Sequence, residues 1–220
     1  MKAVLFDLDN TLVDFFKMKT ASCSAAADAM KKAGLKASRK KILRYMFRIY
    51  GKKGIEYQHV FQALLKKLEG KIDYKIMAAG IVAYRSARES GMTTYPGVKK
   101  TVRGLRKKGY LLGVVSDAPS IQAWMRLWGL GLQDSFDVVV TPGDVRSRKI
   151  SSLPFKAALR ALDVRPEEVF MVGDDPKRDI MPAKRMGMTT VLAKYGETRR
   201  YPGKAHYEIR KFGDLLRIAK

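Results

Sequence analysis

Hydrophobic positions form two different patterns along this chain. From residue 94 onward, short apolar runs alternate with stretches whose apolar residues recur every three or four positions. The short runs predict β-strands and the periodic stretches predict amphipathic helices. The expected strands are 3–6, 110–116, 137–141, 169–172, 189–193 and 207–209, and the expected helices are 98–108, 119–128, 153–162, 180–186 and one from 214. Such alternation is typical of a parallel sheet with crossover helices.

Residues 14–93 show only the helical pattern. Four stretches carry apolar residues at i, i+3 and i+4 spacing, the first of them over 19–33, and glycines separate them. Ser38 is a plausible N-cap of the second stretch, and the fourth begins at Asp73. We therefore expect an α/β fold, namely a Rossmann-like, three-layer parallel-sheet core with an inserted all-helical domain. The core would comprise 1–13 and 94–220, and the insertion 14–93.

The composition is that of a globular protein large enough to bury a core. The chain has 220 residues, of which 46% are apolar. Its single cysteine, Cys23, excludes an internal disulfide and an all-cysteine zinc site, and fits a reducing compartment. No apolar run approaches the ~18 residues of a membrane span, and no signal peptide is visible. We expect a cytoplasmic protein without a membrane partner, as a monomer or a homodimer.

The net charge of +23 is the unusual feature of the composition. Charge of this size bears on solubility and partners rather than on fold. Residues 14–93 hold 18 Lys and Arg against 6 Asp and Glu, so the expected insertion is the denser cation. We favour a solvated basic surface. Binding of polyanions, nucleic acid included, is possible but not favoured.

Polar residues follow the apolar strands at the ends where they should meet. Asp7 and Asp9 follow the first strand, Ser116-Asp117 the second, and Gly173-Asp174-Asp175 with Asp179 the fourth, while Arg146-Ser147-Arg148-Lys149 lies beyond the third. In open α/β sheets, ligands bind at the carboxyl ends of the strands. The hydroxyl of Ser116 and the N–H groups after it would form a phosphate cradle at a helix start. Oxygen-only ligands of this kind suit Mg²⁺.

These segments resemble the four motifs of the haloacid dehalogenase-like superfamily of phosphohydrolases. Asp7-Leu8-Asp9-Asn10-Thr11-Leu12 is similar to the DxDxT first motif, and Ser116 fits the second. Lys149 fits the third-motif lysine, and the stretch 173–179 fits the GDxxxxD form of the fourth. Four motifs in order are a specific signal, and the match covers essentially the whole chain. The helical insertion is similar to the C1-type cap of this family.

The resemblance implies a role for each motif residue. Asp7 would be the nucleophile that takes the phosphoryl group, and Asp9 the general acid and base. Asp7, the backbone carbonyl of Asp9 and Asp174 would hold Mg²⁺, with Asp175 or Asp179 bound to the ion directly or supporting its ligands. Ser116, Asp117 and Lys149 would bind the phosphoryl group. The family often has proline after the third-motif lysine, whereas Ile150 stands here, so Arg148 and Lys156 remain rivals for that role.

The resemblance implies a Mg²⁺-dependent phosphomonoester hydrolase. It would act on a small phosphorylated metabolite through an aspartyl-phosphate intermediate, with the cap closing over the substrate. A phosphomutase would use the same residues and stays open, as does a nucleic-acid-binding module that uses the basic surface. A dehalogenase is disfavoured, because such enzymes lack the second acid of the first motif. Substrate contacts in the cap would come from Phe15, Phe16, Arg44, Arg48, Lys52 and Lys53.

Overall fold

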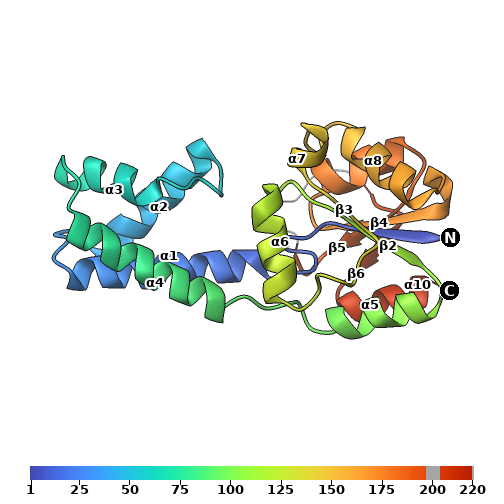
Figure 1. Ribbon diagram of the computed structural model, residues 1–220, viewed down its shortest axis with the longest axis horizontal. Coiled ribbons are helices and arrows are strands. Elements are labelled where there is room, and N and C mark those ends of the chain that lie inside the picture. Colours follow the sequence, from blue (N-terminus) through green and yellow to red (C-terminus); the bar gives the residue numbers. More distant parts are fainter. Residues whose placement is uncertain (197–203, 220) are drawn as a thin grey trace. The chain divides into compact units, whose positions relative to one another are not determined.

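The computed structural model describes residues 1–196 and 204–219, and its centre is a parallel β-sheet (Figure 1). The six strands of the described chain are β1 (Ala3–Phe6), β2 (Leu111–Val115), β3 (Val138–Val140), β4 (Val169–Gly173), β5 (Thr189–Ala193) and β6 (Tyr207–Ile209). Their order across the sheet is β3-β2-β1-β4-β5-β6, and every neighbouring pair is parallel. The direction in which strands are added reverses between β1 and β4. This reversal is the place where ligands bind in sheets of this kind.

The central strands are buried on both faces, as their uninterrupted apolar sequences predict. All residues of β1 and β4 are buried. Gly113 in β2 permits close packing, because a Cβ there would lie 2.7 Å from a methyl carbon of Leu5 and 2.8 Å from one of Val138. The core of the sheet therefore depends on tight contacts that leave no room for a larger residue at this point.

Helices cover the sheet on both faces. Figure 1 shows α8 (Leu153–Leu162) on one side, and α5 (Val98–Lys107) with α10 (Leu215–Ile218) on the other. The remaining helices after β2 are α6 (Ser120–Gly129), α7 (Pro142–Val145) and α9 (Met181–Arg185). Three shorter turns, Pro166–Glu168, the π-helical Pro176–Ile180 and Phe212–Asp214, complete the described chain. The expected α/β fold with a three-layer Rossmann-like core is confirmed.

The chain divides into two compact units. We call Met1–Phe15 with Thr93–Lys220 the core unit, and Phe16–Met92 the helical unit. These limits lie within two residues of the ranges expected from the sequence. Helix α1 (Phe15–Lys32) begins four residues before the expected start at residue 19, and its added first turn buries Phe15 and Met18. Phe15 and Met18 already follow the helical spacing of apolar residues, although they precede the alanine-rich stretch from which the helix was predicted.

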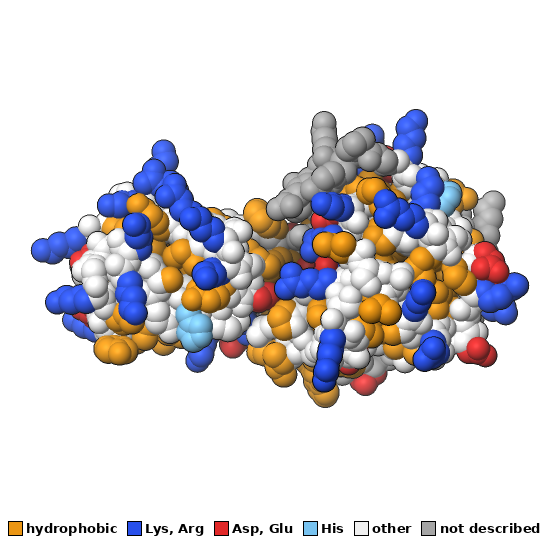
Figure 2. All heavy atoms as spheres, turned by 90° about the horizontal axis from the view of Figure 1, so that it is seen from above, with side chains coloured by type: hydrophobic (Ala, Val, Ile, Leu, Met, Phe, Trp, Pro, Cys, Tyr) orange, Lys and Arg blue, Asp and Glu red, His pale blue; other side chains and the backbone are white. Residues whose placement is uncertain are grey.

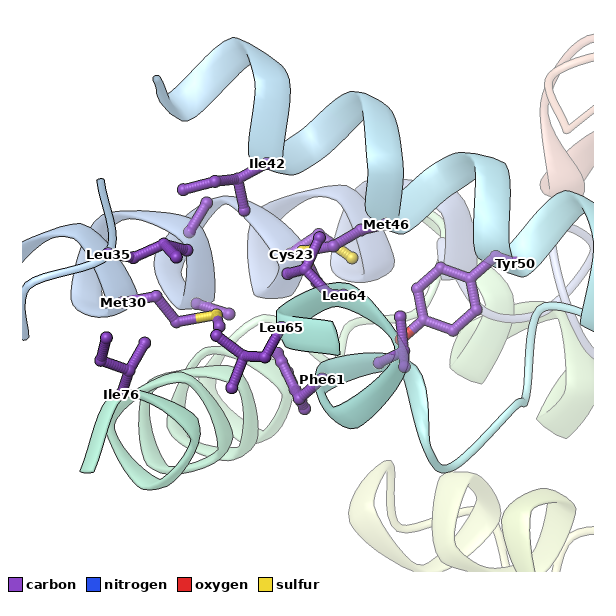
Figure 3. Packing of buried hydrophobic residues seen from close by; sticks show 13 residues of the cluster. Cys23, Met30, Leu35, Ile42, Met46, Tyr50, Phe61, Leu64, Leu65 and Ile76 are labelled. Atoms are coloured by element: carbon purple, nitrogen blue, oxygen red, sulfur yellow. The ribbon is translucent and has the colours of Figure 1, made fainter. Parts of the chain in front are cut away.

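The helical unit has a hydrophobic core of its own (Figure 3). Its helices are α1, α2 (Arg39–Lys53), α3 (Val60–Glu69) and α4 (Tyr74–Ser90). Ile42 and Met46 from α2 point toward Leu64 and Leu65 from α3, and these side chains are fully buried. Ser38 accepts a hydrogen bond from a backbone N–H group in the first turn of α2, as predicted, and Asp73 caps α4 in the same way. The helices are therefore specified locally at their starts and jointly by the shared core.

Basic side chains are spread over the surface of both units. On the face seen in Figure 2, Lys and Arg occur throughout and greatly outnumber Asp and Glu. On this face the basic side chains do not gather into a single stripe, the usual footprint of a nucleic-acid-binding surface. No helix among the described residues combines the length and the apolar character needed to cross a bilayer.

Candidate active site

Two acids of the predicted site stand side by side because their strands are neighbours. Asp7 follows β1 and Asp174 follows β4, and the N–H of Asp7 donates to the carbonyl of Val172 at 2.9 Å. Ser116 follows β2 on the other side of β1. The order of the strands therefore brings three distant segments of the sequence to one edge of the sheet, at its reversal point.

A buried lysine joins two of the acids. Lys149 is 2% exposed, and its Nζ donates to Asp7 Oδ1 and, at 2.6 Å, to Asp179 Oδ1. Burial works to lower the pKa of Lys149, but the carboxylates of Asp179, Asp7 and Asp117 outweigh burial and raise it. Lys149 is therefore a permanent cation that holds Asp7 in place. A buried charge of this kind is tolerated only when it is paired.

The acids outnumber the cation in this cluster. Asp7, Asp174 and Asp179 each offer a carboxylate oxygen, and these oxygens lie within 4.8 Å of one another. Burial, followed by the charges of Asp7 and Asp179, raises the pKa of Asp174 to about 10. Burial likewise raises the pKa of Asp179 to about 6, against the lowering effect of Lys149. Lys149, with Arg178 as a second basic neighbour, thus does not fully offset the charge of three buried carboxylates.

The donor set fits a divalent cation. Asp174 Oδ2 is buried and has no hydrogen-bond partner among the described residues, while Asp174 Oδ1 accepts a 3.4 Å hydrogen bond from Thr11. A buried carboxylate oxygen without a donor is costly unless a cation or a proton satisfies it. Oxygen ligands from Asp7 and Asp174 match the preference of Mg²⁺ for carboxylates. The residues present therefore agree with the expected magnesium site.

Asp175 and Asp117 are placed differently from the three clustered acids. The carboxylate of Asp175 accepts from the N–H groups of Lys177 and Arg178 and from Arg178 Nε at 2.8 Å. Burial works to raise the pKa of Asp175, but Arg178 outweighs it and the pKa is lowered. The structure does not bring Asp175 into the metal cluster, because its carboxylate caps the π-helical turn. Asp117 Oδ1 accepts from the N–H of Lys149 at 2.9 Å, and its Oδ2 lies 3.6 Å from Arg178 Nη1. The carboxylate of Asp117 thus has partners within the protein, and its contact with a phosphate stays a prediction.

Ser116 stands at the start of the segment that leads into α6. Its side chain is buried, and its Oγ accepts a 3.1 Å hydrogen bond from the N–H of Ala118. The loop is thereby fixed between Ser116 and Ala118, directly before Pro119, which precedes the first turn of α6. A hydroxyl and backbone N–H groups at a helix start form a suitable phosphate site. The role of Ser116 as a phosphate ligand stays a prediction.

Asp9 has a partner that the sequence did not reveal. Arg126 of α6 places its Nη1 3.1 Å from Asp9 Oδ2, and its guanidinium carbon lies 4.6 Å from the centre of the Phe15 ring. Arg126 is almost fully buried on the same helix face as Ala123 and Leu127. The sequence does place Arg126 on the apolar face of an amphipathic helix, and a charge at such a position indicates a buried partner. Its partner could not be read from the sequence.

Two tyrosines and a glycine enclose the loop of the first motif. Tyr195 lies two residues past the end of β5, and its hydroxyl donates to the carbonyl of Thr11 at 2.9 Å. The centre of its ring lies 4.6 Å from that of the Tyr95 ring. A Cβ on Gly196 would lie 1.7 Å from the carbonyl oxygen of Asn10. Burial, followed by the charges of Tyr95, Asp174 and Asp7, raises the pKa of Tyr195. The sequence analysis missed these residues because their partners are about 100 to 190 positions away.

Comparison with known proteins identifies the family. A family model described as "Haloacid dehalogenase-like hydrolase" matches residues 4–193. The chain belongs to the haloacid dehalogenase-like hydrolases. It is 32% identical to the glyceraldehyde 3-phosphate phosphatase of Pyrococcus furiosus over 222 residues, a match that spans 99% of this chain and 92% of the relative. The phosphatase of the same name from Methanocaldococcus jannaschii is 32% identical and is covered to 97%, with all of this chain matched.

A solved structure agrees with these relatives. The crystal structure of a haloacid dehalogenase-like phosphatase from Thermococcus onnurineus superimposes with a TM-score of 0.73 at 29% identity, covering 100% of this chain and 98% of that one. The expected family and the expected enzyme class, a phosphatase of this family, are confirmed. The roles of individual residues in this hydrolase stay predictions.

The structure separates the three candidates for the lysine of the third motif. Lys149 is buried against Asp7 and Asp179, whereas Arg148 and Lys156 are exposed. Since the family's phosphoryl-binding cation should lie beside the nucleophile, the geometry favours Lys149. The isoleucine after it replaces the usual proline without preventing this placement.

The predicted substrate residues of the insertion fall into two groups. Arg44, Arg48, Lys52 and Lys53 lie on α2 with exposed side chains, and Phe16 is an exposed residue of the helical unit. Phe15 belongs to the core unit, and its buried ring packs under Arg126. Phe15 therefore lies in the core unit and not in the helical unit, and its contact with a substrate stays a prediction. Substrate contacts of the other five residues stay a prediction.

Proposed function

We propose that this hydrolase is a Mg²⁺-dependent phosphomonoester phosphatase that forms an aspartyl-phosphate on Asp7. The observation that carries the proposal is the buried cluster of Asp7, Asp174 and Asp179 around Lys149. A nucleophilic carboxylate, a fixed cation and a cation-deficient group of acids are the components that phosphoryl transfer requires. All three lie at the carboxyl edge of the sheet.

In the first step, a carboxylate oxygen of Asp7 forms a bond to phosphorus while the bond from phosphorus to the ester oxygen breaks. Asp9, in its protonated form, gives its proton to the departing oxygen, which leaves as an alcohol. Lys149, which contacts Asp7, and the hydroxyl of Ser116 bind the phosphoryl oxygens. Lys149 thereby orients Asp7 and neutralises part of the negative charge of the two reacting groups.

In the second step, a water oxygen attacks phosphorus and the bond between phosphorus and Asp7 breaks. Asp9, now a carboxylate, takes the proton of the attacking water, and the products are inorganic phosphate and regenerated Asp7. Asp7 and Asp174 would hold Mg²⁺, together with the backbone carbonyl of Asp9, and Asp179 would fix Lys149 beside them. When bound, Mg²⁺ supplies positive charge that stabilises the transferring phosphoryl group.

We further propose a substrate of the size and kind of glyceraldehyde 3-phosphate. The supporting fact is the activity for which the relatives from Pyrococcus furiosus and Methanocaldococcus jannaschii are named, since both match this chain over nearly their whole length. The helical unit would serve as the cap that selects the substrate, with Arg44, Arg48, Lys52 and Lys53 as candidate contacts. A cytoplasmic location remains part of the proposal, supported by the free and buried Cys23.

A phosphomutase would use the same first step. The two activities differ in their products, because a mutase returns the phosphoryl group to an organic hydroxyl, whereas a phosphatase releases inorganic phosphate. Purified protein should be supplied with glyceraldehyde 3-phosphate and a panel of other phosphorylated metabolites, with Mg²⁺ or with EDTA. Release of inorganic phosphate only with Mg²⁺ supports the proposal. Appearance of an isomeric phosphate ester without phosphate release would contradict it.

Salt dependence separates the phosphatase from a nucleic-acid-binding module. A small substrate engages one or two charges, so salt should act modestly on KM. Oligonucleotide binding through several Lys and Arg would weaken with a log–log slope of about −0.7 to −0.9 per phosphate contacted, and the double variant Lys52→Ala/Lys53→Ala would make that slope shallower. We expect no oligonucleotide to compete with substrate near physiological salt. Tight oligonucleotide binding that blocks phosphatase activity would overturn the proposal.

A further inference from the structure

Arg126 is a buried cation outside the four motifs of this family. It lies on α6, a helix whose other face exposes Ile121, Trp124, Met125 and Trp128. Arg126 itself is 4% exposed, although a basic residue on the outer face of this helix could remain solvated. Placing a guanidinium in the interior is costly unless a specific partner is gained. The inward direction of Arg126 therefore calls for an explanation.

The surroundings of Arg126 hold its guanidinium in one orientation. Nη1 lies 3.1 Å from Asp9 Oδ2, and the guanidinium carbon lies 4.6 Å from the centre of the Phe15 ring. The guanidinium thus has a charged partner in the carboxylate of Asp9 and an aromatic partner in the ring of Phe15, two kinds of contact that arginine favours. The ring of Phe15 is a rigid and buried support, since Phe15 is 5% exposed.

We propose that Arg126 is a positioning residue, which orients the carboxyl group of Asp9 for proton transfer. The inference rests on the proposed function, in which Asp9 exchanges a proton with the leaving oxygen and then with water. Asp9 belongs to a loop, followed by Asn10 in the left-handed region with φ of 60°. Its side chain is 24% exposed, so burial alone does not select one rotamer of the carboxyl group. Proton transfer requires one geometry, within hydrogen-bond reach of the acceptor.

The loop backbone supplies the other half of this geometry. The N–H groups of Leu12 and Val13 donate to the carbonyl of Leu8, and the N–H of Asn10 donates to the carbonyl of Val13. These bonds fix the Cα of Asp9, but they leave its side-chain torsions undetermined. Arg126 restrains those torsions from the opposite side, through α6. The two restraints together define the position of the Asp9 oxygens.

A leaving-group experiment distinguishes positioning from a structural role. Protonation matters for a poor leaving group such as the alcohol of glycerol phosphate, and little for p-nitrophenolate. In single turnovers, Arg126→Met should slow glycerol phosphate by about 10- to 100-fold, part of the ~10²–10⁴ that general acid catalysis provides, and p-nitrophenyl phosphate by less than about 3-fold. Arg126→Lys keeps the charge but not the stacking face, so its loss on glycerol phosphate should be intermediate.

A double-mutant cycle with Asp9 gives the sharper test. If Arg126 acts only through Asp9, then Asp9→Asn/Arg126→Met should lose no more than about 2-fold beyond Asp9→Asn alone. Arg106→Met is the matched control, because Arg106 also pairs with an aspartate of the core unit, Asp137, at 2.6 Å. This control should leave the ratio of the two substrate rates unchanged.

The outcomes separate this inference from the proposed function. If the wild type hydrolyses neither ester, or if Asp9→Asn slows both equally, the proposed role of Asp9 fails and this inference fails with it. Suppose that Asp9→Asn slows glycerol phosphate more than p-nitrophenyl phosphate. Only the inference is then overturned if Arg126→Met slows both esters equally, or if the loss of the double variant is the product of the two single losses. Should Arg126→Met not fold, Phe15→Leu decides the question. It keeps the ion pair and should produce the same selective loss at smaller size, whereas an equal loss on both esters would refute positioning.

Discussion

Replacing Lys149 by methionine should destabilise the core unit and abolish efficient catalysis. Methionine keeps much of the apolar stem but removes the ammonium that contacts Asp7 and Asp179. Three clustered carboxylates would then face one another without the buried cation. Breaking a buried ion pair by removing one partner typically costs about 3–5 kcal/mol, and losing one electrostatic contact to the transition state costs about 10²–10³ in rate. We expect both losses for Lys149→Met.

Denaturant unfolding followed by tryptophan fluorescence measures the stability of the relevant unit. The only two tryptophans of the chain, Trp124 and Trp128, lie on α6 in the core unit, so their signal does not report the helical unit directly. In EDTA, Lys149→Met should unfold at clearly lower denaturant than the wild type. Mg²⁺ should recover part of the loss, about 2.7 kcal/mol when it is present at 100 times its dissociation constant.

Arg148→Met and Lys156→Met are the matched controls, because both side chains are basic, nearby in sequence and exposed. Surface substitutions of this kind usually change stability by no more than about 0.5 kcal/mol. If Lys149→Met is as stable and as active as these controls, the reasoning about the buried cluster is wrong. If Arg148→Met or Lys156→Met loses the activity instead, that residue is the phosphoryl-binding cation.

Three further predictions concern the metal, the first loop and the helical unit. Chelation should abolish phosphate release and Mg²⁺ should restore it; activity that persists in EDTA would contradict the metal site. Gly196→Ala should lower both activity and thermal stability, because its Cβ would lie 1.7 Å from the Asn10 carbonyl oxygen, and an unchanged melting curve would refute that contact. Burial raises the pKa of Cys23 from 9.0 to about 11, so the folded thiol should resist iodoacetamide at pH 9 while the unfolded chain reacts quickly. Because the thiol has its higher pKa in the folded state, its contribution to the free energy of unfolding is fully present below pH 9 and is lost as the pH rises toward 11. The stability of Cys23→Ala should therefore fall less steeply with alkaline pH than that of the wild type.

The sequence was sufficient to predict the residues at the ends of strands. Asp7 and Asp174 follow short, fully apolar runs, and parallel strands bring their carboxyl ends to one edge. Lys149 follows no strand directly. Its assignment came from the resemblance to the family, and only the fold separates it from Arg148 and Lys156. The choice depends on which side chain is buried beside Asp7, a property of tertiary packing.

Residues that act through long-range contacts could not be predicted in the same way. The sequence places Arg126 among the apolar positions of its helix, but its partner Asp9 lies more than 100 positions away and is brought to it by the fold. Asp175 and Asp179 belong to one motif, yet the π-helical turn directs Asp175 to Arg178 and Asp179 to Lys149. Local spacing cannot distinguish two acids four positions apart when the turn between them is irregular.

Trapping the covalent intermediate tests the central claim most directly. Protein mixed with Mg²⁺ and glyceraldehyde 3-phosphate should be quenched during turnover and treated with borohydride, which reduces an aspartyl-phosphate to homoserine, and the peptides should then be read by mass spectrometry. We expect homoserine at position 7, only when substrate is present, and none in Asp7→Asn, which should also have lost turnover by at least about 10³-fold. Homoserine at another aspartate, or undiminished phosphate release by Asp7→Asn, would contradict that claim.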